Sequence, residues 1–314
     1  MAARSSASGT NGGAVPRRRR GALLLTVRLA SGAGILVVGA LIVVAAIAEK
    51  RARTRYDVPI HAITVPGDQA SIDRGARLAR ARFCSDCHGE GLTGRIMADS
   101  PELGRLAAPN LTSRTAPRAL TDLEWERAVR HGVRANGSAL RLMPAHEFTE
   151  LTDDDLGAII AYARQLPGSS AQVPTTVAGP LLKALDVAGL FKLYPAAGID
   201  HNRPHRARLV AERTPAYGKY MASTCTGCHG ERLSGGKPPG APPDWPAAAN
   251  LTPSGIGHYS LADFTRLLRT GVRPDGSHVN DGMPWTFTRS LDDTEIAAIH
   301  AYLRTVPRRD YGQR

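Results

Sequence analysis

The stretch Cys84-Ser85-Asp86-Cys87-His88 decides the fold, because its C-x-x-C-H pattern returns as Cys225-Thr226-Gly227-Cys228-His229. This spacing is the attachment site of a c-type haem. The two thiols add to the porphyrin vinyl groups, and the adjacent His, His88 or His229, faces the iron as proximal ligand. The four cysteines of these motifs are the only ones in the chain. The sequence therefore predicts two covalently bound haem c groups and leaves no cysteine for a disulfide or a nucleophile.

A C-x-x-C pair has three other readings: a chance occurrence, a zinc knuckle and a redox dithiol. Structural zinc takes four Cys or His ligands at finger-like spacing, whereas each motif supplies three, with no second Cys pair nearby. A thioredoxin-type dithiol needs a βαβ context, whereas both motifs lie between helix-like stretches. The His that follows both pairs favours haem iron.

An apolar segment near the N-terminus predicts a membrane anchor. Leu29 to Ala48 contains twenty residues without a charge, enough to span a bilayer as a helix. Arg17 to Arg20 precede it, after a run of small and polar residues that is typical of disorder. We therefore expect a disordered basic tail over 1–20 and a transmembrane helix over 21–48. Ala46-Ile47-Ala48 resembles a signal cleavage site, but the apolar run is long for a signal peptide, so an uncleaved anchor is favoured.

The net charge of +12 belongs mainly to the flanks of this anchor. Residues 1–56 hold ten bases and one acid, a balance of +9, and the remainder contributes only +3. We therefore expect a membrane flank and no nucleic-acid partner. Because basic residues lie on both sides of the span, the positive-inside rule gives only a small preference for a cytoplasmic N-terminus. Because c-type haem is attached outside the bacterial inner membrane, we expect a single-pass inner-membrane protein with periplasmic C-terminal domains.

The rest of the chain is a duplicated domain. Asn110-Leu111-Thr112 matches Asn250-Leu251-Thr252 at an offset of 140, and Gly132-Val133-Arg134 matches Gly271-Val272-Arg273. The predicted boundaries are a linker over 49–70, a first domain over 71–167, a connector over 168–213, a second domain over 214–307 and a tail over 308–314.

Local signals predict an all-α fold, with an N-terminal transmembrane helix followed by two tandem helical domains. In the first copy we expect helices over 71–83, 123–131 and 152–166, with loops over 89–120. Thr152 is a good N-cap, and three acids follow it in the first turn. The second copy repeats this order, with helices from Pro215, after Ser260 and from Leu291. In the connector, Leu181 to Tyr194 reads as a linker helix on the domain interface, or as a contact with a membrane surface or a partner.

The sixth ligand of each iron can be Met, His, Lys or nothing. Met143 and Met283 occupy matching positions, and each is followed by Pro, which restricts the backbone. They are therefore the expected axial ligands, whereas Met97 and Met221 have no counterpart in the other copy. The other histidines are unmatched between the copies. His131, His146, His258 and His278 are expected at the surface or in hydrogen-bond networks, and the remaining four are expected at the surface: His61, His201, His205 and His300. His/Met ligation closes the iron to substrate, which suits electron transfer.

With these motifs in hand, residues 71–167 and 214–307 resemble class I cytochromes c. Asn250-Leu-Thr-Pro-Ser-Gly-Ile-Gly, Arg269-Thr-Gly-Val-Arg-Pro-Asp-Gly and Met283-Pro284 resemble the membrane-associated cytochrome subunits of periplasmic alcohol and sugar dehydrogenases. The resemblance implies one globular helical domain per haem, in which the helix before C-x-x-C-H crosses the terminal helix. Those subunits usually carry three haem motifs, whereas this chain has two.

The resemblance also implies that the Pro109 carbonyl accepts a hydrogen bond from His88, and the second copy has Ala249 at this place. Gly75 lies nine residues before Cys84, but Gly218 lies only seven before Cys225. The helix crossing is therefore predicted with less support in the second copy.

These observations predict an anchored dihaem cytochrome c, an electron-transfer protein or subunit and not itself an enzyme. We expect it to relay single electrons from a periplasmic dehydrogenase or a quinol-oxidising complex to a terminal acceptor such as an oxidase. The two domains carry balances of −2 (57–167) and +2 (214–314), so we expect their faces to meet different partners. The alternatives are a dihaem subunit of a haem–copper oxidase, and a peroxidase or thiosulfate dehydrogenase with an open or unusually ligated iron. A haem-based sensor would need a signalling domain before the anchor, where only about twenty residues lie inside.

Overall fold

The computed structural model describes residues 17–114, 119–238, 241 and 243–314. Most of the tail expected over 1–20 therefore lies outside the described residues. The chain divides into two units, Met1–Ile47 and Ala48–Arg314. The first unit holds most of helix α1 (Arg17–Arg53). Within α1, the stretch Ser31–Arg53 reaches a mean hydropathy of 2.5 and is long and apolar enough to cross a membrane. Both a membrane anchor and a signal sequence have these properties.

The first copy is built on a crossing of two helices. Helix α2 (Gln69–Ala81) packs on α5 (Asp153–Gln165), as the resemblance implied. At the crossing, a Cβ on Gly75 would lie only 1.9 Å from the carbonyl oxygen of Ala158. Only glycine lets the two backbones come this close. Helix α2 therefore needs a glycine at position 75. The short helix α3 (Cys84–His88), which contains the first motif, follows α2 in the chain.

The second copy repeats this crossing. Helix α7 (Pro215–Met221) packs on α12 (Asp293–Leu303), and a Cβ on Gly218 would again lie 1.9 Å from a carbonyl oxygen, that of Ala298. The different glycine spacing has a local cause. The first copy turns through Phe83 in the left-handed region (φ 59°), whereas the second continues through the 3₁₀ turn η4 (Ala222–Cys225) into α8 (Thr226–His229). The two-residue difference is therefore absorbed in the turn, and the crossing is kept.

Polar caps define the ends of the other main helices. Helices α4 (Asp122–His131) and α10 (Leu261–Thr270) both begin with a capping box, from Thr121 and Ser260, which satisfies orphan backbone N–H groups. The Thr152 side chain accepts from the Asp155 N–H and caps α5, as predicted. The remaining short turns are η1 (Glu90–Leu92), η2 (Ala145–Glu147), α9 (Pro253–Ile256) and α11 (Trp285–Thr288).

The expectation of a mostly helical fold is confirmed, but the expectation of loops over 89–120 is wrong in part. Strands β1 (Arg95–Ser100) and β2 (Gly104–Ala108) form an antiparallel hairpin there, and β3 (Val177–Ala178) pairs with β2. The third strand comes from the connector, about seventy residues later. Local sequence patterns do not reveal such a distant partner.

The connector packs on the first copy. Its helix α6 (Pro180–Val187) is shorter than the predicted 181–194 and is followed by the 3₁₀ turn η3 (Pro195–Gly198). Together with β3, these segments form a small separate core with residues of the linker and the first copy. Its buried members are Val58 of the linker, Val133 and Ala139 of the first copy, and Ala178, Leu182, Leu193, Tyr194 and Ala196 of the connector. The connector therefore works as an extension of the first domain.

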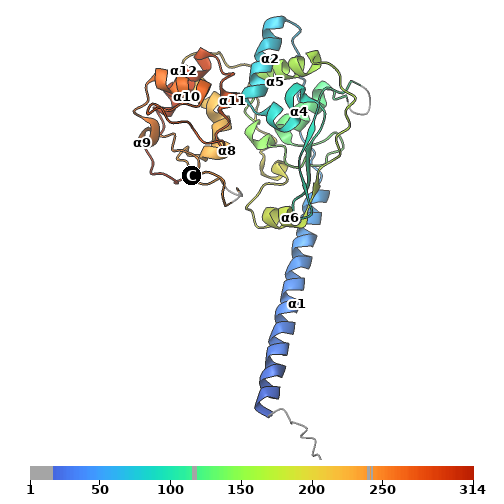
Figure 1. Cartoon of the computed structure of the whole chain (residues 1–314). Helices are drawn as coiled ribbons and strands as arrows, with labels where there is room; N and C mark the ends of the chain where they lie inside the picture. The colour runs from blue at the N-terminus through green and yellow to red at the C-terminus, as the bar shows by residue number, and fades with distance from the viewer. Residues whose placement is uncertain (1–16, 115–118, 239–240, 242) are drawn as a thin grey trace, which may run out of the picture. The chain divides into compact units, whose positions relative to one another are not determined.

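The main apolar core runs through both copies without interruption. Trp125 and Phe148 of the first copy belong to the same buried cluster as Tyr217 and Phe264 of the second. In Figure 1, α2, α4 and α5 form one group, and α10, α11 and α12 form another beside it. Burial of apolar area at this contact stabilises the pairing of the two copies.

Candidate functional site

The first motif presents a buried, oriented histidine. His88 is 7% exposed, and its Nδ1 lies 2.8 Å from the Pro109 carbonyl oxygen, the partner implied by the resemblance. A carbonyl can only accept, so Nδ1 carries the proton and Nε2 keeps its lone pair. Burial lowers the pKa of His88 and favours the neutral ring. The ring is thus held in the tautomer that ligates a metal through Nε2.

The second motif has the same arrangement. His229 is 6% exposed, and its Nδ1 donates to the Ala249 carbonyl oxygen at 2.7 Å. Burial lowers the pKa of His229 as well. The exchange of Pro109 for Ala249 therefore does not disturb the hydrogen bond, because the acceptor is a backbone atom.

Backbone hydrogen bonds tie each motif to the segment that supplies this carbonyl. In the first copy the Gly94 N–H donates to His88 O at 2.8 Å, and the Leu111 N–H donates to Leu92 O at 2.9 Å. The second copy has the matching bonds: Gly235 N–H to His229 O at 2.9 Å, and Leu251 N–H to Leu233 O at 2.8 Å. The positions of the two proximal histidines are therefore fixed by the same local network.

Both networks contain a leucine in a strained conformation. Leu92 and Leu233 have φ values of 54° and 59° and are almost completely buried. A left-handed backbone costs a bulky side chain of order 1–3 kcal/mol, so it persists where the surrounding structure enforces it. Its repetition eight residues after the first Cys of each motif marks it as part of the site.

The repeated Asn-Leu-Thr sequence has a structural role at the same place. The Asn110 side-chain oxygen accepts from the Thr112 N–H at 2.9 Å, while its amide donates to Ser169 O. Asn250 makes the matching bonds with Thr252 and with Arg309 O. In both copies the Asn therefore fastens the carbonyl-bearing segment to the chain that follows the terminal helix.

The thiols fit covalent attachment better than thiolate chemistry. Burial raises the pKa of Cys84 to about 12 and that of Cys225 to about 11, so both remain protonated near neutral pH. A reactive or zinc-binding cysteine needs an accessible thiolate. Two thiols on one helical turn beside a neutral, oriented imidazole are the donor set of a c-type haem. Cys84, Cys87 and His88, and Cys225, Cys228 and His229, are the residues that would hold the two groups.

The methionines expected as sixth ligands lie in equivalent backbone turns. Met143 and Met283 are partly buried and pack against the main core. The N–H two residues later donates to each Met carbonyl, from Ala145 at 2.7 Å and from Trp285 at 2.8 Å. The loops are therefore built alike, and iron coordination by the two thioethers stays a prediction.

Among the other histidines, the surface expectation holds for His61, His258 and His278, which are exposed. For His131, which is 1% exposed at the end of α4, the network alternative holds, because its Nδ1 lies 3.0 Å from His201 Nδ1. The reason is tertiary: the connector covers this position.

Two charged residues that lie near both motifs in the structure, Arg82 and Glu147, were not predicted from the sequence. Arg82 is buried, donates to Ser223 Oγ at 2.5 Å and to Tyr220 O at 3.2 Å, and lies 4.9 Å from the Tyr220 ring. Its charge acts on the thiols of both Cys84 and Cys225, lowering their pKa values against the larger effect of burial. No matched position in the other copy signals its role.

Glu147 approaches the second motif from the first copy. A Cβ on Gly227 would lie 2.9 Å from Glu147 Oε1. Burial raises the pKa of Glu147 to about 6, opposed by the charges of Lys192 and Arg82. The carboxylate also raises the pKa of the Cys87 and Cys228 thiols, after burial. The two attachment motifs therefore lie close to one shared pair of charges.

Comparison with known proteins agrees with this geometry. A family model described as cytochrome c oxidase, cbb3-type, subunit III matches residues 70–162, and a cytochrome c model matches residues 216–307. The chain is 29% identical over 265 residues to the fructose dehydrogenase cytochrome subunit of Gluconobacter japonicus, covering 76% of the chain and 53% of that protein. It is 29% identical over 288 residues to the alcohol dehydrogenase (quinone) cytochrome c subunit of Gluconacetobacter polyoxogenes, covering 78% and 58%.

A third relative, the gluconate 2-dehydrogenase cytochrome c subunit of Pantoea cypripedii, is 28% identical over 290 residues, covering 78% of the chain and 62% of the relative. The chain thus spans little more than half the length of these relatives. The matched residues and the duplicated site agree in placing a cytochrome fold around each motif. The chain therefore consists, beyond its N-terminal helix, of two tandem cytochrome c domains, similar to the cytochrome c subunits of alcohol and sugar dehydrogenases.

Proposed function

We propose that the chain is a membrane-anchored dihaem cytochrome c that passes single electrons from a dehydrogenase subunit to an acceptor at the membrane. The observation that carries the proposal is the joint position of the two motifs. Arg82 acts on a thiol of each motif, and Glu147 of the first copy lies against Gly227 inside the second. Close placement of two redox centres is what an electron relay requires.

Each residue of the motifs has a defined task in this function. When bound, each haem supplies a one-electron iron couple. The four cysteines would hold the groups, and the Pro109 and Ala249 carbonyls keep His88 and His229 oriented. Met143 and Met283 would fill the sixth positions and keep substrates away from the metal, which favours electron transfer over catalysis.

The proposed location and partners rest on α1 and on the relatives. The length and hydropathy of Ser31–Arg53 support a single-pass anchor. The proposed membrane is the bacterial inner membrane, with the two domains in the periplasm, because c-type haem is attached on that side. The relatives are cytochrome c subunits of fructose, alcohol and gluconate dehydrogenases. A dehydrogenase that oxidises an alcohol or a sugar derivative is therefore the proposed electron donor.

The first test is spectroscopic. The full-length protein, made in a host with c-type haem maturation and purified in detergent, should contain two haems by pyridine haemochrome. It should also show two equivalents of the near-infrared band of Met–Fe(III) ligation. One equivalent or none would mean an open or His-ligated iron and would favour the enzymatic alternative.

The second test concerns the relay itself. After a pulse of half an equivalent of reductant per haem, Arg82→Ala should slow equilibration between the haems, whereas Arg80→Ala should not, because Arg80 is exposed on the same helix. Equal equilibration rates in both variants would contradict a role of Arg82 in electron transfer between the haems. Addition of ethanol, fructose or gluconate to membranes that contain the chain should reduce its haems when the matching dehydrogenase is present.

A second candidate is an electron-transfer subunit of a haem–copper oxidase. It is favoured by the description of the family model that matches residues 70–162. In that case the chain would copurify with oxygen-reducing activity, and the dehydrogenase substrates would leave its haems oxidised.

A further inference from the structure

A cluster of histidines and one carboxylate lies outside both haem sites. Glu126 and His131 are on α4, and His205 is on the connector. Glu126 is 0% and His131 1% exposed, and the His205 side chain is 7% exposed. Buried charged and polar groups of this kind are normally paired or bind a metal.

The spacing of these side chains suits a metal ion. Glu126 Oε1 lies 3.4 Å from His131 Nε2 and 3.9 Å from His205 Nε2, and one ligand atom from each residue lies within 4.8 Å of the others. Ligands at about 2.0–2.2 Å from zinc are roughly 3.4 Å apart in a tetrahedron. The three atoms are therefore near that spacing, and small side-chain rotations close the rest.

Hydrogen bonds do not satisfy these groups. Within the described part of the chain, both Glu126 oxygens, His131 Nε2 and both His205 ring nitrogens lack a hydrogen-bond partner. A buried polar atom without a partner is costly. The unpartnered atoms of all three residues point to one shared ligand that accepts lone pairs.

Arg130 Nη1 also lies near Glu126 Oε1, at 3.9 Å, which is too far for a hydrogen bond, and it has no hydrogen-bond partner among the described residues. Arg130 Nη2 donates to Asp153 at 2.7 Å and to Leu151 O at 2.6 Å. The second copy repeats this ion pair as Arg269 with Asp293 at 2.6 Å, while threonines stand at the positions that match Glu126 and His131: Thr265 and Thr270. The arginine therefore serves the fold in both copies, and the Glu/His pair is an addition to the first.

A neighbouring histidine supports the required tautomer. His131 Nδ1 lies 3.0 Å from His201 Nδ1, so one of the two must donate to the other. With the proton on His131 Nδ1, the Nε2 lone pair faces Glu126. Metal-binding histidines commonly donate through the other ring nitrogen, which orients the ring.

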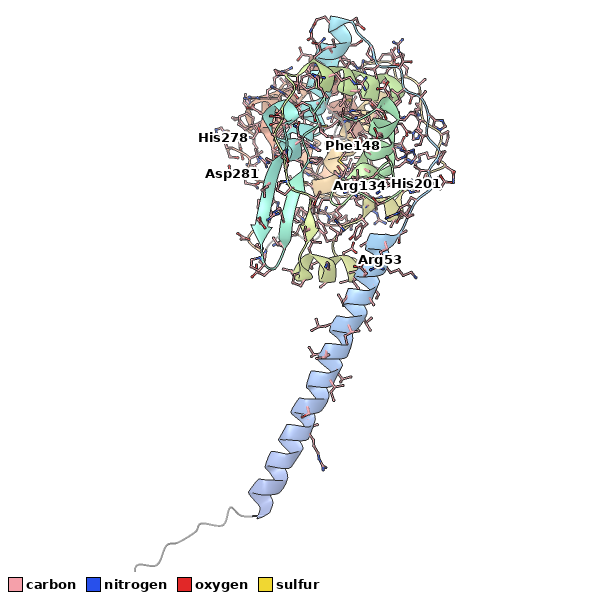
Figure 2. The ribbon with its side chains drawn as sticks, turned by 90° about the vertical axis from the view of Figure 1, so that its right-hand side faces the viewer. Arg53, Arg134, Phe148, His201, His278 and Asp281 are labelled. Carbon is pink, nitrogen blue, oxygen red and sulfur yellow. The ribbon has the colours of Figure 1, made fainter. Side chains whose placement is uncertain are left out.

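One side of the cluster borders a hollow. A hollow of about 580 Å³ is lined by His61, Asp153, His201 and His205, among others, and His205 is the member of the cluster that reaches it. An ion would therefore enter from the His205 side. Figure 2 shows His201 on one side of the body and His278, of the second copy, on the other.

We propose that Glu126, His131 and His205 bind one divalent transition-metal ion, of which Zn²⁺ is the best match, and that this ion fastens the connector to the first domain. Two imidazoles and one carboxylate suit Zn²⁺, and also Cu²⁺, Fe²⁺ or Ni²⁺, better than Ca²⁺ or Mg²⁺. The site does not depend on the identity of the redox partners. It adds a third metal centre to a chain that holds two haem sites.

The test uses the full-length haem-loaded protein in detergent, without a polyhistidine tag, after treatment with a chelator. The chelator-treated protein is then dialysed against zinc. Its zinc content by mass spectrometry should be one equivalent per chain. His205→Ala and Glu126→Gln should hold none, whereas His278→Ala, which removes an exposed histidine of the second copy, should hold one. At free zinc about a hundred times the dissociation constant, the Tm of the wild type should rise by roughly 5–10 °C.

Two haems per chain and an unchanged visible spectrum in each variant show that the domains are folded. If the wild type retains no divalent transition metal, or if His205→Ala retains the same equivalent, the proposal is overturned. A Tm that zinc raises equally in the wild type and in Glu126→Gln would overturn it as well. Copper or iron in place of zinc as the tightest ion would leave the residues correct and change the metal.

Discussion

Replacing Glu147 by Gln should stabilise the protein at neutral pH. Burial raises the pKa of this carboxyl from 4.5 to about 6, against the opposing charges of Lys192 and Arg82. A difference of about 1.5 pH units corresponds to about 2 kcal/mol, at 1.36 kcal/mol per unit. At pH 7 the ionised Glu147 therefore costs the folded state about 2 kcal/mol, a cost that the neutral amide of Gln avoids.

The sign of the pH dependence follows from proton binding. The folded protein holds the Glu147 proton more tightly than the unfolded chain, so the contribution of this residue to the free energy of unfolding falls as pH rises from about 4.5 to about 6. Above pH 6 the penalty is complete, and below pH 4.5 it vanishes. The stability difference between Glu147→Gln and wild type should therefore open over this window.

The assay is thermal unfolding of the haem-loaded proteins followed by circular dichroism at pH 4.5, 5.5 and 7. At pH 7 the variant should melt about 4–8 °C above the wild type, since 1 kcal/mol shifts Tm by about 2–4 °C at this size. Glu102→Gln, at an exposed position, is the matched control and should change little. An equal gain at pH 4.5 and pH 7, or no gain at pH 7, would refute the reasoning.

Three further substitutions test the fold. Gly218→Ala places a Cβ 1.9 Å from Ala298 O and should cost about 1–3 kcal/mol, read from a urea midpoint; an unchanged midpoint would contradict the crossing. Tyr220→Phe removes the phenol that donates to buried Asp155 and should cost about 1–3 kcal/mol in the same assay. The comparison variant is Tyr217→Phe: it removes a buried hydroxyl that has no hydrogen-bond partner among the described residues, so it should leave the midpoint unchanged or raise it. Ser260→Ala loses the α10 capping box and should lower stability by about 1 kcal/mol, seen as a lower Tm.

The features that sequence reasoning predicted are those with local causes. Thr152 and Ser260 cap helices because a side-chain oxygen reaches an N–H three residues later. The hydrogen bond from His88 to the Pro109 carbonyl was implied by the resemblance to class I cytochromes c, and not by a local pattern. The duplication then transfers each local prediction to the other copy, which explains why the helix order was predictable for both domains.

The features that were missed depend on distant partners. Strand β3 pairs with β2 across about seventy residues. Arg82 contacts Tyr220, 138 residues away, and His131 is buried by a connector that was expected on the domain interface. These residues occur in one copy alone. A comparison of matched positions in the two copies therefore gives them no weight.

This pattern separates two kinds of residue in the chain. The shared ones, such as the strained Leu92 and Leu233, surround the attachment motifs and reproduce one binding site twice. The unshared ones join parts: Arg82 and Glu147 connect the first domain to the second motif, and Glu126 and His131 face the connector. After a duplication, each copy already has a complete site, so what remains to be specified is how the copies are held together. Substitutions at Arg82 and Glu147 should therefore act on the coupling between the two centres while leaving the count of haems at two.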